Sequence, residues 1–278
     1  MNDVTNHMNL LDTDVTTTMY ADDITFSFSI DKTVMKETEN IVRTVLTHSE
    51  KWFGYNELYL NNEKTIHCLF SSQRTSELHY AKFLGVQFDS HMSWSSHIDT
   101  MCTSLSKAVY AIRKISFIID SGAALTAYYG MFHSVLNYGV LAWGNASHSQ
   151  LQRIFLVQKA AVRGIMRASH DEHCRQFFKS LKIMTVFAVI LYQHLIHTKK
   201  HLTNYCTLSD IHGYNTHGKN KLIPPSSRIN VATSLGVDYY NILPENVSNL
   251  PLNAFKRKVR SILLEVAPYN FNQFKEYF

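Results

Sequence analysis

Two adjacent carboxylates, Asp22 and Asp23 in the stretch TTTMYADDITFSFS, are the residues of this sequence with the clearest capacity for chemistry. Held at a bend about 4 Å apart, two carboxylates repel each other by about 4 kcal/mol at an intermediate dielectric constant. A divalent cation such as Mg2+ removes that repulsion, because it commonly combines one or two carboxylates with substrate phosphates. The pair therefore indicates metal-assisted phosphoryl transfer. An ordinary acidic turn is the alternative, since Asp favours turns by bonding to nearby backbone.

The residues around the pair predict a β-hairpin that carries it at the tip. Residues 16–20 are mostly β-branched or aromatic, which favours a strand. After the pair, apolar residues alternate with small polar ones, and the apolar positions are Ile24, Phe26, Phe28 and Ile30. A period of two is typical of a strand with one buried face, so Ala21, Asp22 and Asp23 form the turn.

A helix and two further short elements are expected to follow. The helix spans residues 31–53 and starts with an Asp cap, and its inward stripe comprises Val34, Ile41, Val45, Leu46 and Trp52. Residues 56–70 predict a turn followed by strand-like pieces, with Lys64 near an exposed end. Residues 80–88 predict a second hairpin, in which Gly85 permits a close approach by another backbone or a nucleic-acid terminus, or forms a bulge.

The most regular helical pattern lies in residues 94–115. Its apolar positions repeat at alternating spacings of four and three, which makes one continuous stripe. The stripe comprises Trp94, Ile98, Met101, Leu105, Ala108, Ile112 and Ile115. The other faces carry Lys107, Arg113 and Lys114, and such a basic face suits contact with duplex phosphates. A core helix with a solvated face is the alternative.

Further helical patterns fill the C-terminal half. Apolar positions at helical spacing follow Gly122 and comprise Leu125, Tyr128, Phe132 and Leu136. Ser147 and Gln150 form a capping-box pattern that opens a helix, and its expected polar face comprises Gln158, Lys159, Arg163 and Arg167. The apolar run 183–196 predicts a buried helix, and the mixture of Gly, Pro, His and Lys in 209–228 predicts a basic surface loop.

A final helix is expected after Pro251, which suits the first helical position. Its apolar stripe comprises Leu252, Phe255, Val259, Ile262 and Leu263, and its opposite face carries Lys256, Arg257, Lys258 and Arg260. This basic face could touch RNA or DNA, or could simply be solvated.

The motif Tyr20-Ala21-Asp22-Asp23 resembles the YADD signature of reverse transcriptases, specifically those of jockey-type non-LTR retrotransposons. KFLGVQFD (82–89) resembles the primer-grip hairpin of that family, and MSWSSHI (92–98) resembles the start of its thumb. Other similar stretches occur in the expected order at 52–65, 128–147 and 239–264. The resemblance covers essentially the whole chain and is closest over 19–146.

The resemblance implies an α+β fold in which a partial polymerase palm precedes a mostly α-helical thumb and C-terminal region. Antiparallel hairpins with a packed helix are expected to form the palm part in residues 1–90. The thumb and connection are expected in 91–168, and a helical and loop region with a basic final helix is expected in 169–278.

The resemblance also implies RNA-directed DNA synthesis on an RNA template and a DNA primer, with deoxynucleoside triphosphates and Mg2+ or Mn2+. In this reading Asp22 binds metal directly and Asp23 supports the cluster, while Lys64 either assists the departure of pyrophosphate or is a solvated turn lysine. The residues expected to contact primer or nucleotide are Tyr20, Ala21, Phe83, Leu84 and Gly85. Further candidates for nucleic-acid contact are Lys107, Arg113, Lys114, Lys256, Arg257 and Lys258.

The composition agrees with a globular protein that has a polyanionic partner. The chain has 278 residues, 45% hydrophobic and 18% charged, and 27 basic against 22 acidic residues give a net charge of +5. Four cysteines without C-x-x-C spacing favour reduced intracellular thiols. His194, His197 and His201 could share a helix face near Cys206, but no second ligand pair follows, so a metal site there is disfavoured.

The sequence favours a protein that is neither secreted nor inserted in a membrane. The first residues lack the basic start and apolar core of a signal peptide, and the apolar run 183–196 is shorter than the ~20 residues that cross a bilayer. The replication habit of the resembling elements implies an intracellular location, in the nucleus or cytoplasm.

The chain is expected to be incomplete as a polymerase. A working palm needs a further aspartate on an earlier strand and fingers that close on the nucleotide, and the residues before Tyr20 are too few to supply them. Asp12 and Asp14 lie in a linker-like stretch. We therefore expect a fragment that is inactive alone and needs a missing N-terminal polymerase segment. A non-catalytic nucleic-acid-binding fragment and a decayed transposon remnant are the alternatives.

Overall fold

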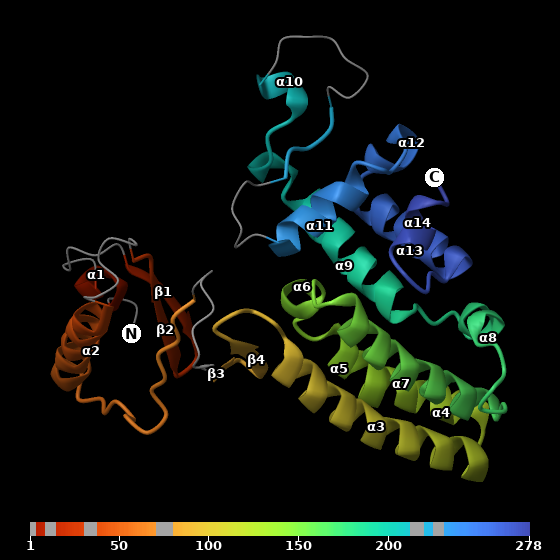
Figure 1. The fold of residues 1–278 in the computed structure, drawn as a ribbon, viewed down its shortest axis with the longest axis horizontal. Helices are drawn as coiled ribbons and strands as arrows, with labels where there is room; N and C mark the ends of the chain where they lie inside the picture. The colour runs from red at the N-terminus through yellow and green to blue at the C-terminus, as the bar shows by residue number, and fades with distance from the viewer. Residues whose placement is uncertain (1–3, 9–14, 31–37, 71–79, 212–219, 225–230) are drawn as a thin grey trace. The chain divides into compact units, whose positions relative to one another are not determined.

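The computed structural model describes residues 4–8, 15–30, 38–70, 80–211, 220–224 and 231–278. The chain divides into two compact units, Met1–Phe70 and Ser71–Phe278. Both helices and antiparallel hairpins occur in the described residues, so the predicted α+β class is confirmed (Figure 1).

The first unit contains a hairpin that packs with two helices. Its elements are α1 (Val4–Met8), β1 (Val15–Tyr20), β2 (Asp23–Phe28) and α2 (Thr38–Tyr55). β1 and β2 pair antiparallel, with Val15 opposite Phe28 and Tyr20 opposite Asp23. Val15 shares a small core with Val45 and Trp52 of α2. The predicted hairpin is therefore confirmed, and so is the apolar side of the helix that packs with it; the predicted start of that helix lies outside the described residues.

Residues 56–70 differ from the prediction, because this described segment contains turns and no strand. The amide of Leu58 bonds back to the carbonyl of Phe53, and the amides of Lys64 and Thr65 bond back to Asn61. The amides of these three residues are therefore used in local turns and do not pair with a neighbouring strand. Apolar alternation alone therefore does not form a strand here.

The second unit begins with a hairpin and is otherwise helical. Its first elements are β3 (Tyr80–Phe83), β4 (Val86–Asp89), α3 (Ser95–Ile118), α4 (Ser121–Ala127), the π-helix η2 (Tyr128–His133), α5 (Ser134–Asn137), α6 (Val140–Trp143) and α7 (His148–Met166). The later elements are α8 (Arg175–Ser180), α9 (Val186–Lys200), η3 (Leu202–Asn204), α10 (Leu208–Ile211), α11 (Val231–Tyr240), α12 (Glu245–Ser248), α13 (Leu252–Val266) and α14 (Asn272–Lys275).

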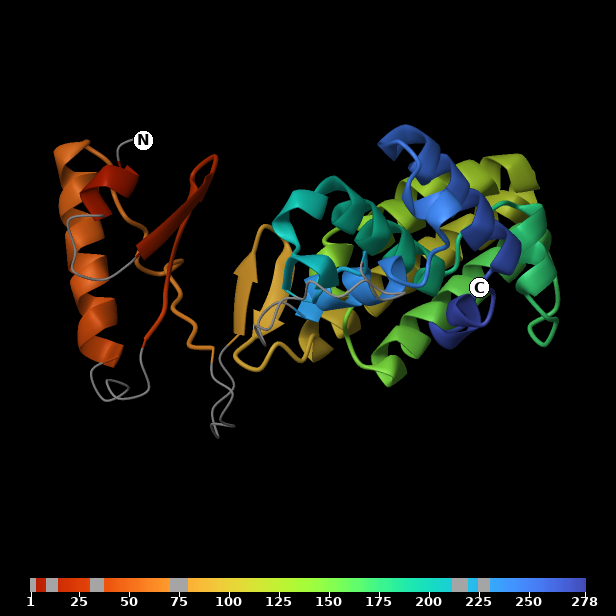
Figure 2. The same cartoon turned by 90° about the horizontal axis from the view of Figure 1, so that it is seen from above.

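One core joins the long helices of this unit. α3 packs along α7, and α9 packs against α7, α11 and α13 (Figures 1 and 2). α9 is buried around most of its circumference, as expected for a helix that is apolar on all sides. The predicted hairpin at 80–88 and the predicted helical stripes that start at Trp94, Leu125 and Pro251 are confirmed. The predicted basic loop at 209–228 lies mostly outside the described residues.

The expected polar face of α7 is wrong at Gln158. Ser147 and Gln150 form the predicted capping box at the start of this helix, but Gln158 is fully buried. Its amide nitrogen donates to Tyr128 Oη at 2.8 Å and to the carbonyl of Met184 at 2.9 Å, and its oxygen accepts from the amide of Val186 at 2.8 Å. Burial is tolerated because the described side chain satisfies its donors and acceptor inside the core.

No helix within the described ranges has the length and apolar character needed to cross a bilayer. The second hairpin, at 80–89, lies in the same unit as the helices that follow it. Assignment of palm and thumb roles to these parts stays a prediction.

Candidate metal tip and nucleic-acid groove

The carboxylates of Asp22 and Asp23 lie at the tip of the first hairpin. Because Tyr20 pairs with Asp23, the turn consists of Ala21 and Asp22 alone. Ala21 has a φ of 53°, in the left-handed region that costs a non-glycine residue about 1 kcal/mol or more. Such strain occurs often at functional sites. The tip is therefore short, and its backbone is held in an uncommon conformation.

Both carboxylates are exposed, and neither forms an ion pair or side-chain hydrogen bond with the described residues. Tyr20 beside them is 65% exposed. Two free carboxylates on adjacent residues fit part of the oxygen shell of Mg2+ or Mn2+, which is otherwise completed by water and phosphate. Asp22 and Asp23 are therefore the residues that could hold such an ion, and binding of the ion stays a prediction.

A complete protein cage is not formed by the described residues. Among them, no three His, Cys, Asp or Glu side chains come close enough to hold a metal ion. This holds for the tip and also for the end of α9, where the ring of His197 lies 4.4 Å from that of His201, the residue after the helix. Any metal at the tip would thus need ligands from substrate, solvent or another polypeptide segment.

Lys64 lies in the same unit as the tip, in an exposed turn. Its amide donates to the carbonyl and to the side-chain oxygen of Asn61, at 3.1 and 3.2 Å. The described contacts do not join Lys64 to Asp22 or Asp23, so the structure does not bring the three proposed catalytic side chains together.

The second hairpin has the turn geometry expected for two antiparallel strands. Leu84 and Gly85 have φ values of 46° and 82°, and positive φ at both central residues defines a type I′ turn. Phe83, the third residue of the predicted primer-grip set here, is partly buried at the end of β3. Glycine is required at position 85 by conformation, whether or not a primer approaches it.

Tyr138, at the end of α5, holds this turn. Its hydroxyl donates to the carbonyl of Leu84, and a Cβ at Gly85 would lie 3.6 Å from its ring. Gly139, with a φ of 61°, allows close contact with Val86, because a Cβ there would lie 2.9 Å from that side chain. At Gly85 the structure thus shows an ordinary van der Waals distance to the ring of Tyr138, whereas the expected approach of another chain or a nucleic-acid terminus stays a prediction.

Asp89 connects the hairpin to α3. Its carboxylate accepts from the amides of His91 and Ser93, at 2.9 and 3.1 Å, and from the Ser93 hydroxyl at 2.6 Å. Burial would raise the pKa of Asp89, but these hydrogen bonds outweigh that effect and lower the pKa. The hairpin is consequently fixed to the start of the helix that carries the proposed nucleic-acid contacts.

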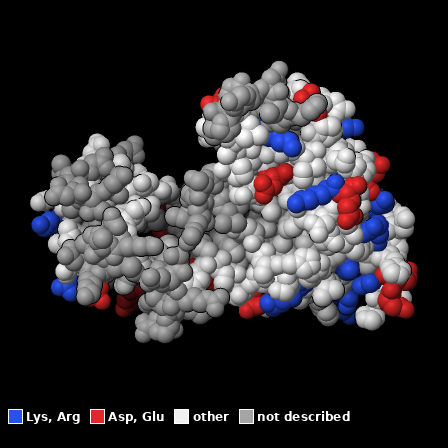
Figure 3. Space-filling view, turned by 45° about the horizontal axis from the view of Figure 1, so that its top comes forward, with Lys and Arg blue, Asp and Glu red and all other residues white. Residues whose placement is uncertain are grey.

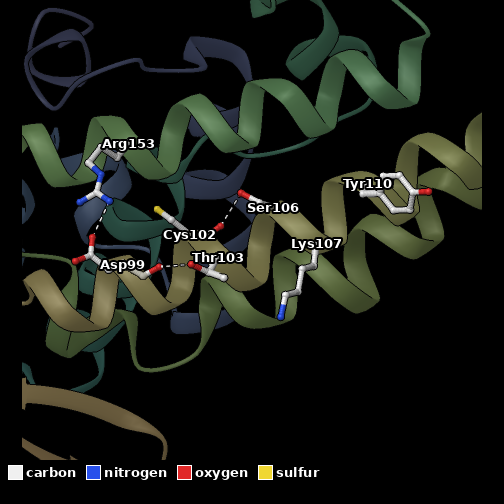
Figure 4. A pocket seen from close by; sticks show the side chains of 7 residues that line it. All are labelled: Asp99, Cys102, Thr103, Ser106, Lys107, Tyr110 and Arg153. Carbon is white, nitrogen blue, oxygen red and sulfur yellow. Dashed lines mark hydrogen bonds and ion pairs between the residues drawn. The ribbon is translucent and has the colours of Figure 1, made fainter.

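A shallow groove, open to solvent, lies between α3 and α7 and has a volume of about 790 Å³ (Figure 4). Its lining includes Lys107, Tyr110 and an ion pair between Asp99 and Arg153, whose oxygen and nitrogen lie 2.6 Å apart. The carboxylate of Asp99 raises the pKa of Arg153. Burial raises the pKa of the Cys102 thiol, which also lines the groove, so this thiol is not activated as a nucleophile.

The proposed nucleic-acid contacts do not all lie in this groove. Lys107 lines it, Arg113 lines a second hollow that adjoins it along the same helices, and the ammonium of Lys114 lies 5.7 Å from the centre of the Tyr110 ring. The basic face of α13, with Lys256 partly buried and Arg257 and Lys258 exposed, belongs to another part of the unit, because α7 and α9 separate α13 from α3.

Charge on the surface is mixed beyond these groups. On the face shown in Figure 3, Lys and Arg side chains alternate with Asp and Glu. Positive charge therefore does not form a continuous patch on that face. A site for a polyanion is better inferred from the local group of cations in the groove than from the net charge of the chain.

Sequence reasoning missed the residues that α7 contributes to the groove. Arg153 carries no motif, and it becomes relevant only because α7 packs along α3. Gly164 was also missed, although a Cβ there would lie 2.6 Å from Arg113 Cγ. Glycine at this position lets the stem of Arg113 lie across α7. An alternation of small and long residues on facing helices is the only signal that could have suggested it.

Comparison of this chain with protein-family models, with curated proteins and with solved structures finds no match.

Proposed function

We propose that this chain supplies part of the active site of an RNA-directed DNA polymerase of a jockey-type non-LTR retrotransposon. The observation that supports this most is the pair of exposed carboxylates at a two-residue hairpin turn, backed by a packed helix. In this proposal the first unit is part of the palm, and the second begins with the primer-grip hairpin and the thumb.

The proposed reaction is nucleotide addition directed by an RNA template. The primer 3′ oxygen forms a bond to the α-phosphorus of a deoxynucleoside triphosphate, the bond to pyrophosphate breaks, and the proton of the primer hydroxyl passes to solvent. Divalent ions, when bound, would stabilise the charge on the attacking and leaving oxygens. Asp22 would hold the ion, Asp23 would complete the acidic tip, and Tyr20 would pack beside the primer end or nucleotide. Lys64 faces the leaving pyrophosphate if the complete palm brings it near.

The remaining metal ligands are proposed to come from a further polymerase segment. The tip offers two carboxylates, and the described residues around it offer no third acidic ligand. We propose that a complete catalytic palm also uses an additional aspartate and fingers, and that a further polymerase segment which supplies them is a binding partner of the first unit.

Binding of Mn2+ to the full chain tests the tip. Paramagnetic broadening of NMR signals is expected at residues 20–24 and is expected to disappear in Asp22→Asn. Glu39→Gln, which removes an exposed carboxylate from α2 in the same unit, is the matched control and should keep the broadening. Equal broadening in wild type and Asp22→Asn would refute the proposal.

Primer extension tests the requirement for a further segment. The chain alone, with an RNA template, a DNA primer and Mg2+, is expected to be inactive. Robust incorporation that Asp22→Ala abolishes would show that the chain is a sufficient polymerase and would overturn the requirement.

A second candidate function, nucleic-acid binding without catalysis, is favoured by the groove between α3 and α7. Three phosphate contacts, by Lys107, Arg113 and Lys114, would give a slope of about −2.1 for a single strand, or about −2.7 for a duplex, when log affinity is plotted against log salt concentration. Absent or salt-independent binding would dismiss this candidate.

A further inference from the structure

The groove between α3 and α7 is longer than the part drawn in Figure 4. A second hollow continues it along the same two helices, and the two parts share Ser106 and Tyr110. From Asp99 to Arg113 its floor extends about 21 Å along α3, at about 1.5 Å per residue. This length accommodates a short extended polymer rather than a single small molecule.

Cations outnumber carboxylates along the groove. Lys107, Arg113 and Arg153 line it, against Asp99 as the one acidic residue of its lining. Asp99 pairs with one terminal nitrogen of Arg153, and a guanidinium has five donor hydrogens, so Arg153 keeps donors for another acceptor. The balance of charge favours a polyanionic occupant.

An aromatic ring stands between the two parts of the groove. Tyr110 is 67% exposed, and the ammonium of Lys114 lies 5.7 Å from its ring centre. On the facing helix, Leu156 is 60% exposed and offers an apolar wall. Cations that flank an exposed ring are typical of sites for single-stranded nucleic acid, where bases stack and the backbone follows the positive charge.

We propose that the α3–α7 groove binds single-stranded nucleic acid, with one base stacked on Tyr110 and the neighbouring phosphates held by Lys107, Arg113 and Arg153. The identity of this strand as template RNA rests on the proposed polymerase function, whereas the binding itself does not.

The lining of the groove distinguishes a single strand from other polyanions. A duplex presents phosphates outward and keeps its bases paired inside, so it would leave Tyr110 and Leu156 without a base to contact. An acidic amphipathic helix would need a continuous apolar floor, and the hydroxyls of Thr103 and Ser106 interrupt the floor of this groove. Unpaired bases match both the ring and the polar floor.

Fluorescence anisotropy with a labelled oligouridylate tests the proposal on the full chain, in EDTA and at low salt. Wild type is expected to bind the single strand more tightly than its duplex with oligoadenylate. Tyr110→Ala is expected to weaken binding about 5- to 150-fold, the effect of one lost stacking contact. Tyr110→Phe keeps the ring and should bind within about twofold of wild type.

Two controls separate this effect from misfolding and from the loss of an exposed tyrosine elsewhere on the surface. Tyr277→Ala removes another exposed tyrosine, outside the groove, and should bind as wild type does. Circular dichroism should be unchanged in Tyr110→Ala, because the side chain is mostly exposed.

Absent binding, equal binding by Tyr110→Ala, tighter binding of the duplex, or equally strong competition by polyglutamate would each overturn the proposal. Because EDTA removes divalent ions, this result is independent of metal binding at the acidic tip. Failure of the groove proposal and failure of the polymerase proposal are therefore distinguishable.

Discussion

Replacement of Gln158 by Leu is expected to destabilise the second unit strongly. In the native core this one side chain serves the hydroxyl of Tyr128, the carbonyl of Met184 and the amide of Val186. The last of these belongs to the first turn of α9, whose amide groups have no partner within the helix. Leucine fills a similar space but offers none of the three hydrogen bonds.

The size of the effect follows from the three groups left behind. A buried donor or acceptor without a partner costs about 1–3 kcal/mol, and the apolar surface of the new leucine offsets part of the sum. We therefore expect the free energy of unfolding to fall by about 3–6 kcal/mol. Such a loss is a large share of the roughly 5–15 kcal/mol that stabilises a typical domain.

Urea unfolding followed by far-UV circular dichroism measures this loss, since most described helices belong to the second unit. Gln152→Leu on the same helix is the matched control, because Gln152 is partly exposed and its bond to the carbonyl of Tyr269 is long, at 3.3 Å. The control is expected to cost less than about 1 kcal/mol. If Gln158→Leu lost no more stability than Gln152→Leu, the reasoning from buried partners would be refuted.

Three further substitutions or conditions test other parts of the structure. Gly236→Ala is expected to lower the melting temperature, because its Cβ would lie 2.4 Å from Thr198 Oγ1 and separate α11 from α9; an unchanged temperature would contradict this close approach. Ala21→Gly is expected to stabilise the first unit by about 0.5–1 kcal/mol in urea unfolding, since it relieves a left-handed conformation; destabilisation would contradict that strain. Burial lowers the pKa of His97 and of His133 in the folded state below the ordinary histidine value of 6.5. As the pH falls below 6.5, these two histidines therefore bind more protons in the unfolded chain than in the folded one. The free energy of unfolding should therefore be highest above pH 6.5 and should fall as the pH drops through the folded-state values; a flat profile in urea titrations would argue against buried neutral imidazoles.

Local patterns predicted a large part of this protein. The hairpin that carries Asp22 and Asp23 follows from strand-forming residues on either side of a bend, although Asp23 belongs to β2 and not to the predicted three-residue turn. The stripe that begins at Trp94 follows from helical spacing. Both patterns depend only on which face of one element is apolar. The position of the acidic pair at an exposed tip could therefore be predicted, and so could the capping box at Ser147.

Contacts between distant segments decided the rest. Gln158 looks like a surface residue in the sequence, and only the packing of α7 against η2 and α9 makes it a core residue. Residues 56–70 alternate like a strand, but a strand forms only where another edge supplies partners. Arg153 joins Tyr110 in one groove because α7 lies along α3, and no periodicity within either helix encodes that pairing. The sequence determined the faces of the elements, whereas tertiary packing determined which faces meet, since that depends on the combined shapes of residues far apart in the chain.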